Sequence, residues 1–175
     1  MAARRLPLEQ ALLGFLLQGP AHGYDLHRQV QDELGRVWYV GISSVYAALQ
    51  QLEDDGLVQS TVVAQADRPA RKVFQVTAGG REHFVAWVRR PVLVIRDVRV
   101  EFVARLYFFR VLALDGVEHL ISEQESVCRQ QLERLAQDAA ECAPDDFYRL
   151  VVAYRKGQIE ATLNWLHDCQ SFLSG

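Results

Sequence analysis

Apolar residues recur at helical spacing in two segments close to the amino terminus. The first, 8–17, stops at Gly19-Pro20, a pair that ends helices and begins turns. The second runs from about Gly23 to Leu34, and Gly35 follows it as the expected carboxyl-terminal cap. Both patterns predict short amphipathic helices. Their apolar positions are Leu8, Leu12, Leu13, Leu16 and Leu17 in the first segment, and Tyr24, Leu26, Val30 and Leu34 in the second.

A third apolar stripe, within 43–55, predicts a helix of about three turns, because Val45, Leu49 and Leu52 recur at i, i+4 and i+7. Ser43 fits its N-cap and Gly56 fits the left-handed residue just past its last turn. The outward face of this helix carries no charge, and its length suits one crossing of the major groove of DNA. The residues on that face are Ser43, Ser44, Tyr46, Ala47, Gln50 and Gln51.

After Gly56 the pattern changes from helical spacing to strand-forming residues. The runs 57–63 and 73–76 are rich in valine, and the segment 67–70 between them is expected to be a loop. This pair of strands completes a mainly α fold, a winged helix-turn-helix of three helices and a two-stranded wing. Three cations, Arg68, Arg71 and Lys72, are placed at the tip of the wing, where they would neutralise phosphates or enter a minor groove.

Five ordered motifs in this part of the chain resemble PadR-like transcriptional regulators, and the resemblance covers about residues 6–91. A further segment, 96–102, looks like the start of the helical second domain of longer members. The chain departs from the family pattern at Ala47, where proline is usual, and at Ser43, where glycine is frequent. The motifs are Gly19–Leu26, Ser44-Val45-Tyr46 with Leu49, Leu52–Val58, Arg68–Phe74 and Thr77–Arg81.

The second half of the sequence is predicted to be helical throughout. The segment 98–114 is almost continuously apolar, 117–140 carries an apolar stripe, and 147–173 carries a seam at steps of three and four. We therefore assign 1–91 to the DNA-binding domain and 92–175 to an all-helical dimerisation domain. A partner helix inside the same chain is the alternative for the seam. The seam residues assigned to dimerisation are Val151, Tyr154, Ala161, Trp165 and Phe172.

The expected DNA-binding residues come from the predicted second helix, third helix and wing. Tyr46 is expected to contact phosphate, and Gln50 can make two hydrogen bonds to adenine. Buried tyrosines and ordinary exposed polar residues are the alternatives. The resemblance implies two-fold dimers, and hence a pseudo-palindromic operator in double-stranded DNA that a repressor would occupy. The full set is Tyr24, Ser43, Ser44, Tyr46, Gln50, Arg68, Arg71 and Lys72.

The charge distribution limits how the chain can bind nucleic acid. The formal net charge is −3, but 1–91 holds ten Lys and Arg against nine Asp and Glu, whereas 92–175 holds nine against thirteen. The first part is thus +1 and the second −4. Because +1 is weak, binding should depend on a few placed cations and on dimerisation rather than on a broad basic field.

Other functional classes find little support in the sequence. It contains no Gly-rich phosphate loop, GxSxG or HExxH motif, so we expect no enzyme and no cofactor. The three cysteines, 128, 142 and 169, lack metal-binding spacing, and no apolar run is long enough to cross a membrane, so we expect reduced thiols, no metal and a cytoplasmic protein. The alternative function is a winged-helix protein-protein adaptor that does not bind DNA.

The resemblance also implies a small-molecule effector, such as a phenolic compound or a hydrophobic drug, that releases a repressor from DNA. The sequence does not name this molecule. Trp38, Trp87 and Trp165 offer flat apolar faces for a hydrophobic or aromatic ligand, and packing in the core is the alternative for all three.

Overall fold

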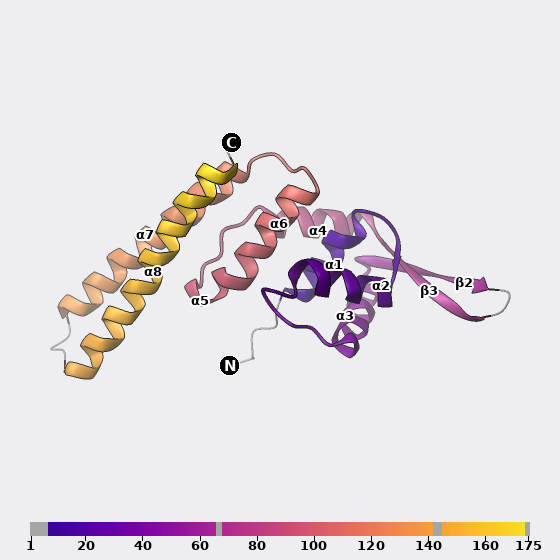
Figure 1. Cartoon of the computed structure of the whole chain (residues 1–175), viewed down its shortest axis with the longest axis horizontal. Helices are drawn as coiled ribbons and strands as arrows, with labels where there is room; N and C mark the ends of the chain where they lie inside the picture. Colours follow the sequence, from indigo (N-terminus) through magenta and orange to yellow (C-terminus); the bar gives the residue numbers. More distant parts are fainter. Residues whose placement is uncertain (1–6, 66–67, 142–144, 174–175) are drawn as a thin grey trace. The chain divides into compact units, whose positions relative to one another are not determined.

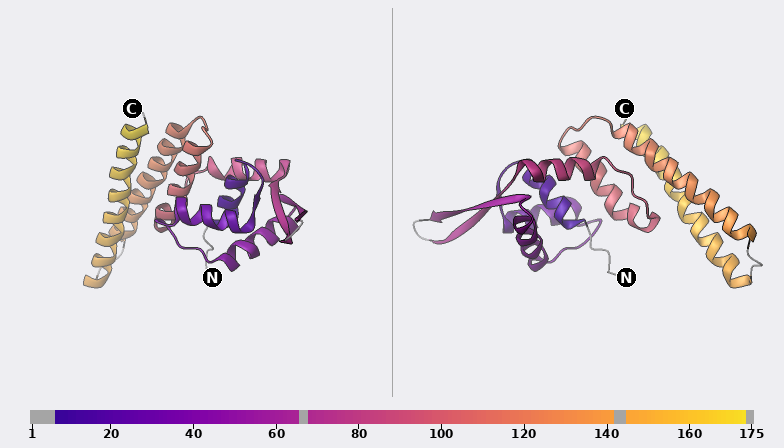
Figure 2. Two further views of the ribbon diagram at one scale, coloured as in Figure 1. Left: turned by 45° about the vertical axis from the view of Figure 1, so that its right-hand side comes forward. Right: turned by 180° about the vertical axis from the view of Figure 1, so that it is seen from behind.

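The computed structural model describes residues 7–65, 68–141 and 145–173. The chain forms two compact units and passes between them more than once (Figures 1 and 2). The first unit comprises Met1–Arg90 and Val103–Leu114, and the second comprises Pro91–Phe102 and Asp115–Gly175. The chain first passes from one unit to the other at Pro91, near the predicted domain boundary. The segment 103–114, which the sequence assigns to the second domain, belongs instead to the first unit.

Three short helices open the first unit, as the apolar spacing predicts. The second predicted helix is α-helical at first and then continues as a π-helical turn. The third begins at Ile42, so its N-cap lies two residues before Ser43, the predicted N-cap. Gly41 has that position, and its carbonyl accepts hydrogen bonds from the amides of Ser44 and Val45. The elements are α1 (Leu8–Leu16), α2 (Gly23–Gln29), η1 (Val30–Leu34) and α3 (Ile42–Asp54).

Gly56 ends α3 in the left-handed conformation that was predicted, with φ at +69°. The amide of Leu57 returns to the carbonyl of Leu52 at 2.9 Å and satisfies a carbonyl in the last turn of the helix. An L-residue with a Cβ is strained at this φ, so glycine fits this turn. The turn directs the chain from α3 straight into the wing.

The wing is a long antiparallel hairpin of β2 (Val58–Gln65) and β3 (Arg68–Val76) (Figure 1). The predicted loop at 67–70 is wrong for residues 68–70, which belong to β3, and Asp67 lies outside the described residues. A third strand, β1 (Ala21–His22), pairs with β3 and gives the order β1-β3-β2. We did not predict β1 because two residues after Gly19-Pro20 are too few to show an alternating pattern.

The core of the first unit gathers around Phe108 on α6 (Val103–Val111). The ring of Phe108 contacts Phe15 of α1 at 5.2 Å and Phe84 of α4 (Ala78–Val88) at 5.3 Å between centroids, both edge to face. Phe108 also lies so close to Gly14 that a Cβ there would clash with its ring. Helix α6 is therefore an integral part of the first unit.

The second unit is built on two long antiparallel helices, α7 (Val117–Glu141) and α8 (Asp146–Leu173), which lie side by side (Figures 1 and 2). The short helix α5 (Ile95–Asp97) and the π-helical turn η2 (Val98–Phe102) complete it. The predicted single apolar helix over 98–114 is thus divided between η2 and α6, which belong to different units. Its nearly continuous apolar character fits a segment of which one part is buried in the second unit and the other part in the first.

Asp145 caps the start of α8, where its carboxylate accepts a hydrogen bond from the amide of Tyr148 at 2.7 Å. The neighbouring Pro144, which was expected in the first turn of this helix, lies outside the described residues, as does Cys142. The buried side chains of the two long helices include Leu120, Ile121, Cys128, Leu135, Ile159 and Leu166. Among the described residues, we find no helix long and apolar enough to cross a membrane.

Candidate nucleic-acid interface

A concave surface of about 420 Å³ lies on the first unit where the start of α2, the outward face of α3 and strand β3 meet. Four residues that were singled out from the sequence line it together, although they come from three separate motifs. They are Tyr24, Tyr46, Arg71 and Lys72, and the remaining lining residues are His22, Gly23 and Asp25. We call this surface the tyrosine concavity.

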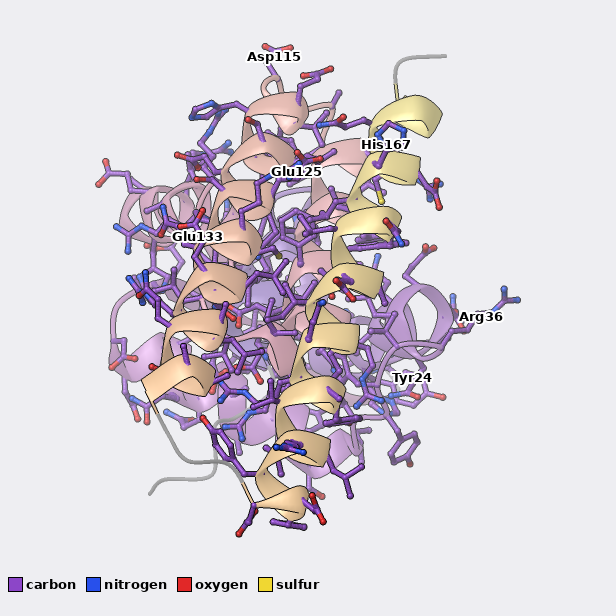
Figure 3. All side chains as sticks on the ribbon, turned by 90° about the vertical axis from the view of Figure 1, so that its left-hand side faces the viewer. Tyr24, Arg36, Asp115, Glu125, Glu133 and His167 are labelled. Atoms are coloured by element: carbon purple, nitrogen blue, oxygen red, sulfur yellow. The ribbon has the colours of Figure 1, made fainter. Side chains whose placement is uncertain are left out.

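The two tyrosines are exposed rather than buried. Tyr24 is 59% and Tyr46 48% exposed, which removes the alternative that they are core residues. Tyr24 projects outward from the ribbon (Figure 3). Tyr46 lies against the backbone of Gly23, where an added Cβ would come within 2.6 Å of its ring. Glycine at this position thus allows the recognition helix to pack its tyrosine onto the start of α2.

The polar residues predicted on α3 are exposed but do not all line the tyrosine concavity. Ser43 and Gln50 lie on the open surface, and the amide of Gln50 donates a hydrogen bond to Asp54 at 2.8 Å. Ser44 lines a different hollow, of about 450 Å³, beside the loop before α3, together with Tyr39. Base-edge contact by Gln50 would require its amide to leave Asp54.

The three wing cations differ in position, and the prediction that all three lie at the tip is wrong. Arg68 pairs with Gln65 at the end of the hairpin, and its side chain is outside the described set. Arg71 pairs with Val63 farther along the ladder and is exposed. Lys72 pairs with Val62, so successive side chains of β3 place Arg71 and Lys72 on opposite faces of the strand.

Lys72 is engaged by Glu53, a residue near the end of α3 that sequence reasoning missed. Its ammonium lies 2.5 Å from Glu53 Oε2, and Ser60 donates to Glu53 Oε1 at 2.5 Å. The hydrogen bonds from Lys72 and then from Ser60 hold the pKa of Glu53 below its ordinary value. The only sequence clue was an acidic run after an apolar stripe, which is also common on solvated helix ends.

His22 is a second residue that was missed. Its Nδ1 lies 3.1 Å from the carbonyl oxygen of Lys72, next to the pairing of β1 with β3. The start of α2, the wing and α3 are therefore connected through the backbone and side chain of Lys72. This arrangement fixes the surfaces that surround the tyrosine concavity.

The predicted dimerisation seam is distributed over different environments on α8. Tyr154 is 67% exposed, Ala161 is exposed and Val151 is half-buried. Trp165 instead packs edge to face on Phe102 of the same chain, at 6.0 Å between ring centroids. The side chain of Phe172 is outside the described set. The exposed apolar side chains gather in the first half of α8, where Phe147 and Leu150 join Tyr154.

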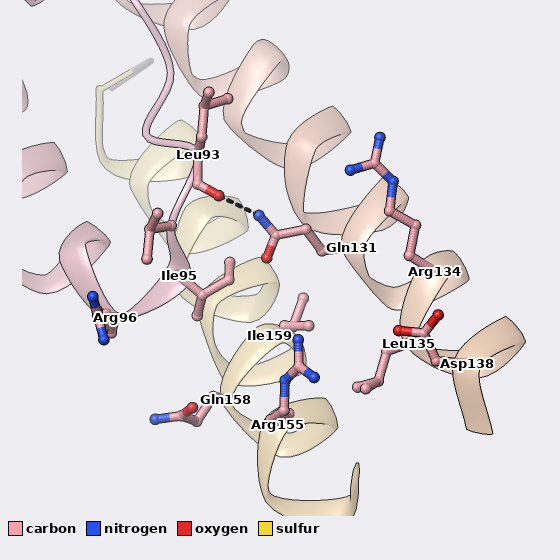
Figure 4. A pocket seen from close by; sticks show the side chains of 11 residues that line it. Leu93, Ile95, Arg96, Gln131, Arg134, Leu135, Asp138, Arg155, Gln158 and Ile159 are labelled. Atoms are coloured by element: carbon pink, nitrogen blue, oxygen red, sulfur yellow. Dashed lines mark hydrogen bonds between the residues drawn. The ribbon is translucent and has the colours of Figure 1, made fainter. Parts of the chain in front are cut away.

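A cavity of about 520 Å³ lies within the second unit between α7, α8 and the segment 93–96 (Figure 4). Its wall combines apolar side chains with three arginines, Arg96, Arg134 and Arg155, and one carboxylate, Asp138. The apolar side chains are Leu93, Val94, Ile95, Leu135 and Ile159.

The three tryptophans do not line this cavity. Trp38 is buried, Trp87 lies under the guanidinium of Arg105 at 4.9 Å, and Trp165 contacts Phe102. Packing therefore accounts for all three rings. Within 7–65, 68–141 and 145–173, no group of three or more potential ligand side chains could hold a metal ion.

Two family models match this sequence. The model described as "Transcriptional regulator PadR-like family" matches residues 12–86, which include the tyrosine concavity and the wing. The model described as "Virulence activator alpha C-term" matches residues 98–174. The sequence is also 28% identical over 117 residues to the negative transcriptional regulator PadR of Bacillus subtilis and 29% identical over 94 residues to a probable transcriptional regulator of Mycobacterium tuberculosis.

These two matches cover 67% and 54% of this chain, and they span 64% and 50% of the relatives' own lengths. Solved structures of similar fold include Bacillus subtilis PadR in complex with operator DNA, at 24% identity over 94% of this chain and 98% of that one, with a TM-score of 0.49. A PadR-like regulator from Bacillus cereus covers 99% of both chains at 21% identity, with a TM-score of 0.44.

Proposed function

The chain belongs to the PadR-like family of transcriptional regulators, and from this premise we propose that it is a homodimeric repressor that binds a pseudo-palindromic DNA operator. The observation that carries the proposal is the tyrosine concavity, where exposed hydroxyls and cations from α2, α3 and β3 converge. Hydroxyl groups and cations are the side chains that contact phosphates, whereas base edges are contacted from a helix in the major groove.

In the proposed complex, α3 enters the major groove and the wing follows the flanking backbone. Tyr24 and Tyr46 donate hydrogen bonds to phosphate oxygens, and Arg68 and Arg71 neutralise phosphates. Ser43, Ser44 and Gln50 face the base edges from the exposed side of α3. The weak positive charge of the first 91 residues supports a mechanism in which these few contacts, doubled by a two-fold partner, provide the affinity.

Dimerisation is proposed to use α8. Exposed apolar side chains at Phe147, Leu150 and Tyr154 supply a surface that a second copy would cover. Two α3 helices related by a two-fold axis would contact half-sites separated by about one turn of DNA, roughly 34 Å, or a multiple of it. Sedimentation equilibrium of the wild type and of a Leu150→Asp variant tests this, because a charge on the contact face should shift the protein toward monomer.

We also propose that a small effector carrying an acidic group binds the cavity of the second unit. Its apolar wall suits a hydrophobic or aromatic body, and three arginines suit an anion. Thermal-shift measurements with aromatic carboxylates test this proposal, with Arg134→Ala/Arg155→Ala as the variant that should lose the response. Ligand binding changes operator affinity only to the extent that the ligand distinguishes the DNA-bound from the free protein.

Membership of a family of regulators supports a role without catalysis, and we place that role in the cytoplasm, where the operator is. Binding to fragments of the surrounding genome, measured by fluorescence anisotropy over a series of salt concentrations, tests the central proposal. The wild type should show a saturable site with a steep dependence on salt.

In a homodimer the variant Arg68→Ala/Arg71→Ala removes two phosphate contacts from each protomer, so the slope of log affinity against log salt should become shallower by about 3.6, since each contact contributes about 0.9. Arg129→Ala/Arg149→Ala, on α7 and α8, removes the same charge and should leave the slope nearly unchanged. If the wild type shows no saturable binding to any fragment, the DNA-binding proposal is wrong, and the protein-protein adaptor becomes the better hypothesis.

A further inference from the structure

Glu53 differs from the other acidic residues at the end of α3 in what it binds. The next two carboxylates, Asp54 and Asp55, accept hydrogen bonds from the neutral amides of Gln50 and Gln51 on the same helix. Glu53 instead reaches across to the wing and pairs with the ammonium of Lys72. It is therefore the carboxylate of this run that compensates a cation of the proposed DNA-binding surface.

Both oxygens of Glu53 are engaged. Oε2 accepts from Lys72 and Oε1 accepts from Ser60 on β2, so the carboxylate connects the recognition helix to both strands of the wing. The side chain of Glu53 is only 25% exposed, whereas that of Lys72 is 41% exposed. The lowered pKa of Glu53 means that the carboxylate is charged at neutral pH and that the pair persists there.

Lys72 is held from a second direction as well. Its ammonium lies 5.2 Å from the centroid of the Phe74 ring, within the range of a cation–π contact. Arg71, the preceding residue on β3, has no ion pair to any side chain in the described part of the chain. Two adjacent wing cations thus differ in availability: Arg71 can neutralise a phosphate directly, whereas Lys72 must first leave Glu53.

We propose that Glu53 is a specificity-determining residue that withholds Lys72 from phosphates and thereby limits sequence-independent binding to DNA. Phosphate contacts supply nearly all of non-specific affinity, and base contacts supply the discrimination. A carboxylate that compensates one wing cation therefore weakens binding to every sequence and leaves the base contacts of α3 in place. In this arrangement Lys72 is a positioning residue for the wing. The inference rests on the proposed DNA-binding function.

The test measures binding to a random-sequence duplex over a salt series, with full-length protein. Glu53→Gln keeps the size of the side chain and one acceptor oxygen, which can still accept from Ser60, but it removes the charge and the second acceptor that hold Lys72. Because one Lys72 is released in each protomer of the dimer, we expect the salt slope to steepen by about 1.8, so that affinity falls by roughly a further 12-fold between 50 and 200 mM salt. Asp54→Asn is the matched control, because it removes an equal charge one residue away without releasing a cation.

Two wing variants make the test independent of how well Glu53→Gln folds. Arg71→Gln should make the slope shallower by about 1.8, one contact from each protomer, whereas Lys72→Gln should leave it unchanged because its charge is already compensated. The double variant Glu53→Gln/Lys72→Gln should return to the wild-type slope. Circular dichroism melting identifies any variant whose fold is lost.

Several outcomes would overturn the inference. If Lys72→Gln lowers the slope as much as Arg71→Gln, Lys72 contacts phosphate despite Glu53. If Glu53→Gln behaves like Asp54→Asn, the carboxylate acts only through its net charge. In both cases the wild type still binds DNA, so the proposed role of Glu53 would be wrong and the proposed DNA-binding function would stand. A wild type that binds no duplex at low salt would overturn the proposed function together with this inference.

Discussion

Gln124 on α7 allows a direct test of how the second unit binds the segment 91–96, where the chain enters it from the first unit. Its side chain is fully buried on α7, donates to the carbonyl of Val92 at 2.9 Å and accepts from the amide of Val92 at 2.6 Å. One primary amide thus satisfies both backbone groups of a residue that is itself 1% exposed. Replacing Gln124 with leucine keeps the approximate volume and removes both hydrogen bonds.

The expected cost follows from the two backbone groups left without partners. Each buried donor or acceptor that loses its hydrogen bond costs about 1–3 kcal/mol, so the pair costs about 2–6 kcal/mol. Leucine recovers part of this, because burying an apolar side chain is more favourable than burying an amide. We expect Gln124→Leu to lower the free energy of unfolding of the second unit by about 3 kcal/mol.

The matched control is Gln131→Leu, on the same helix. Gln131 donates to the carbonyl of Leu93, the next residue of the same segment (Figure 4). Unlike the bonds of Gln124, this contact is open to solvent. Water can replace it, so the loss should stay below about 1 kcal/mol. Urea unfolding gives the stabilities, and hydrogen exchange of a peptide spanning 91–96 reports the segment directly even if the two units unfold separately.

A small and equal effect of the two substitutions would refute this reasoning. It would mean that Val92 finds other partners when Gln124 is removed and that the buried amide does not hold the segment. Faster exchange confined to the 91–96 peptide in Gln124→Leu alone would support it. Far-ultraviolet circular dichroism should remain close to that of the wild type in both variants, since neither substitution disfavours the helix.

Gly23→Ala should displace the Tyr46 ring and weaken operator binding roughly a hundred-fold, because a hydrogen bond to a charged group is worth about 1.5 kcal/mol and each protomer of the dimer loses one; Gly79→Ala, where the nearest atom is 3.8 Å from an added Cβ, should not. Burial, followed by the charge and hydrogen bond of Glu33, raises the pKa of Tyr107 to about 12. Ultraviolet titration should therefore show a late tyrosine phase that Tyr107→Phe removes. Because the folded state favours the neutral phenol, its stabilising contribution is present below pH 10 and is lost as the pH rises toward 12.

Local patterns were sufficient to predict the winged helix-turn-helix. The stripe at Val45, Leu49 and Leu52 placed α3 to within two residues, and Gly56 has the left-handed conformation expected after it. The two strands of the wing were predicted from their β-branched residues. These features depend on spacing and backbone preference, which a single sequence records directly.

Contacts between distant segments could not be predicted in the same way. Tyr24, Tyr46 and Arg71 were each singled out, but their convergence on one concavity depends on the packing of α2 against α3 and β3. The pairing of Glu53 with Lys72 joins residues 19 positions apart, and no periodicity marks it. The prediction of equivalent wing cations failed for this reason, since sequence shows charge but not the partner that compensates it.

The prediction of a single helix over 98–114 in the second domain was wrong for a different reason. An almost uniformly apolar run predicts burial on most sides, which is correct for Phe102 and Phe108. It does not show that the run changes units between Phe102 and Val103. An apolar residue can be buried in either of two hydrophobic cores, so hydrophobicity alone does not predict where the chain leaves one core and enters the other.

The position of α6 also has a consequence for synthesis on the ribosome. When the first ninety residues have emerged, the surfaces of Gly14, Phe15 and Phe84 that pack on Phe108 have no ring to cover them. The helices and wing of the first unit can form early, but its core closes only after the chain has passed through 91–102 and delivered α6. A nascent chain arrested in that interval exposes apolar surface, the kind of intermediate to which chaperones bind.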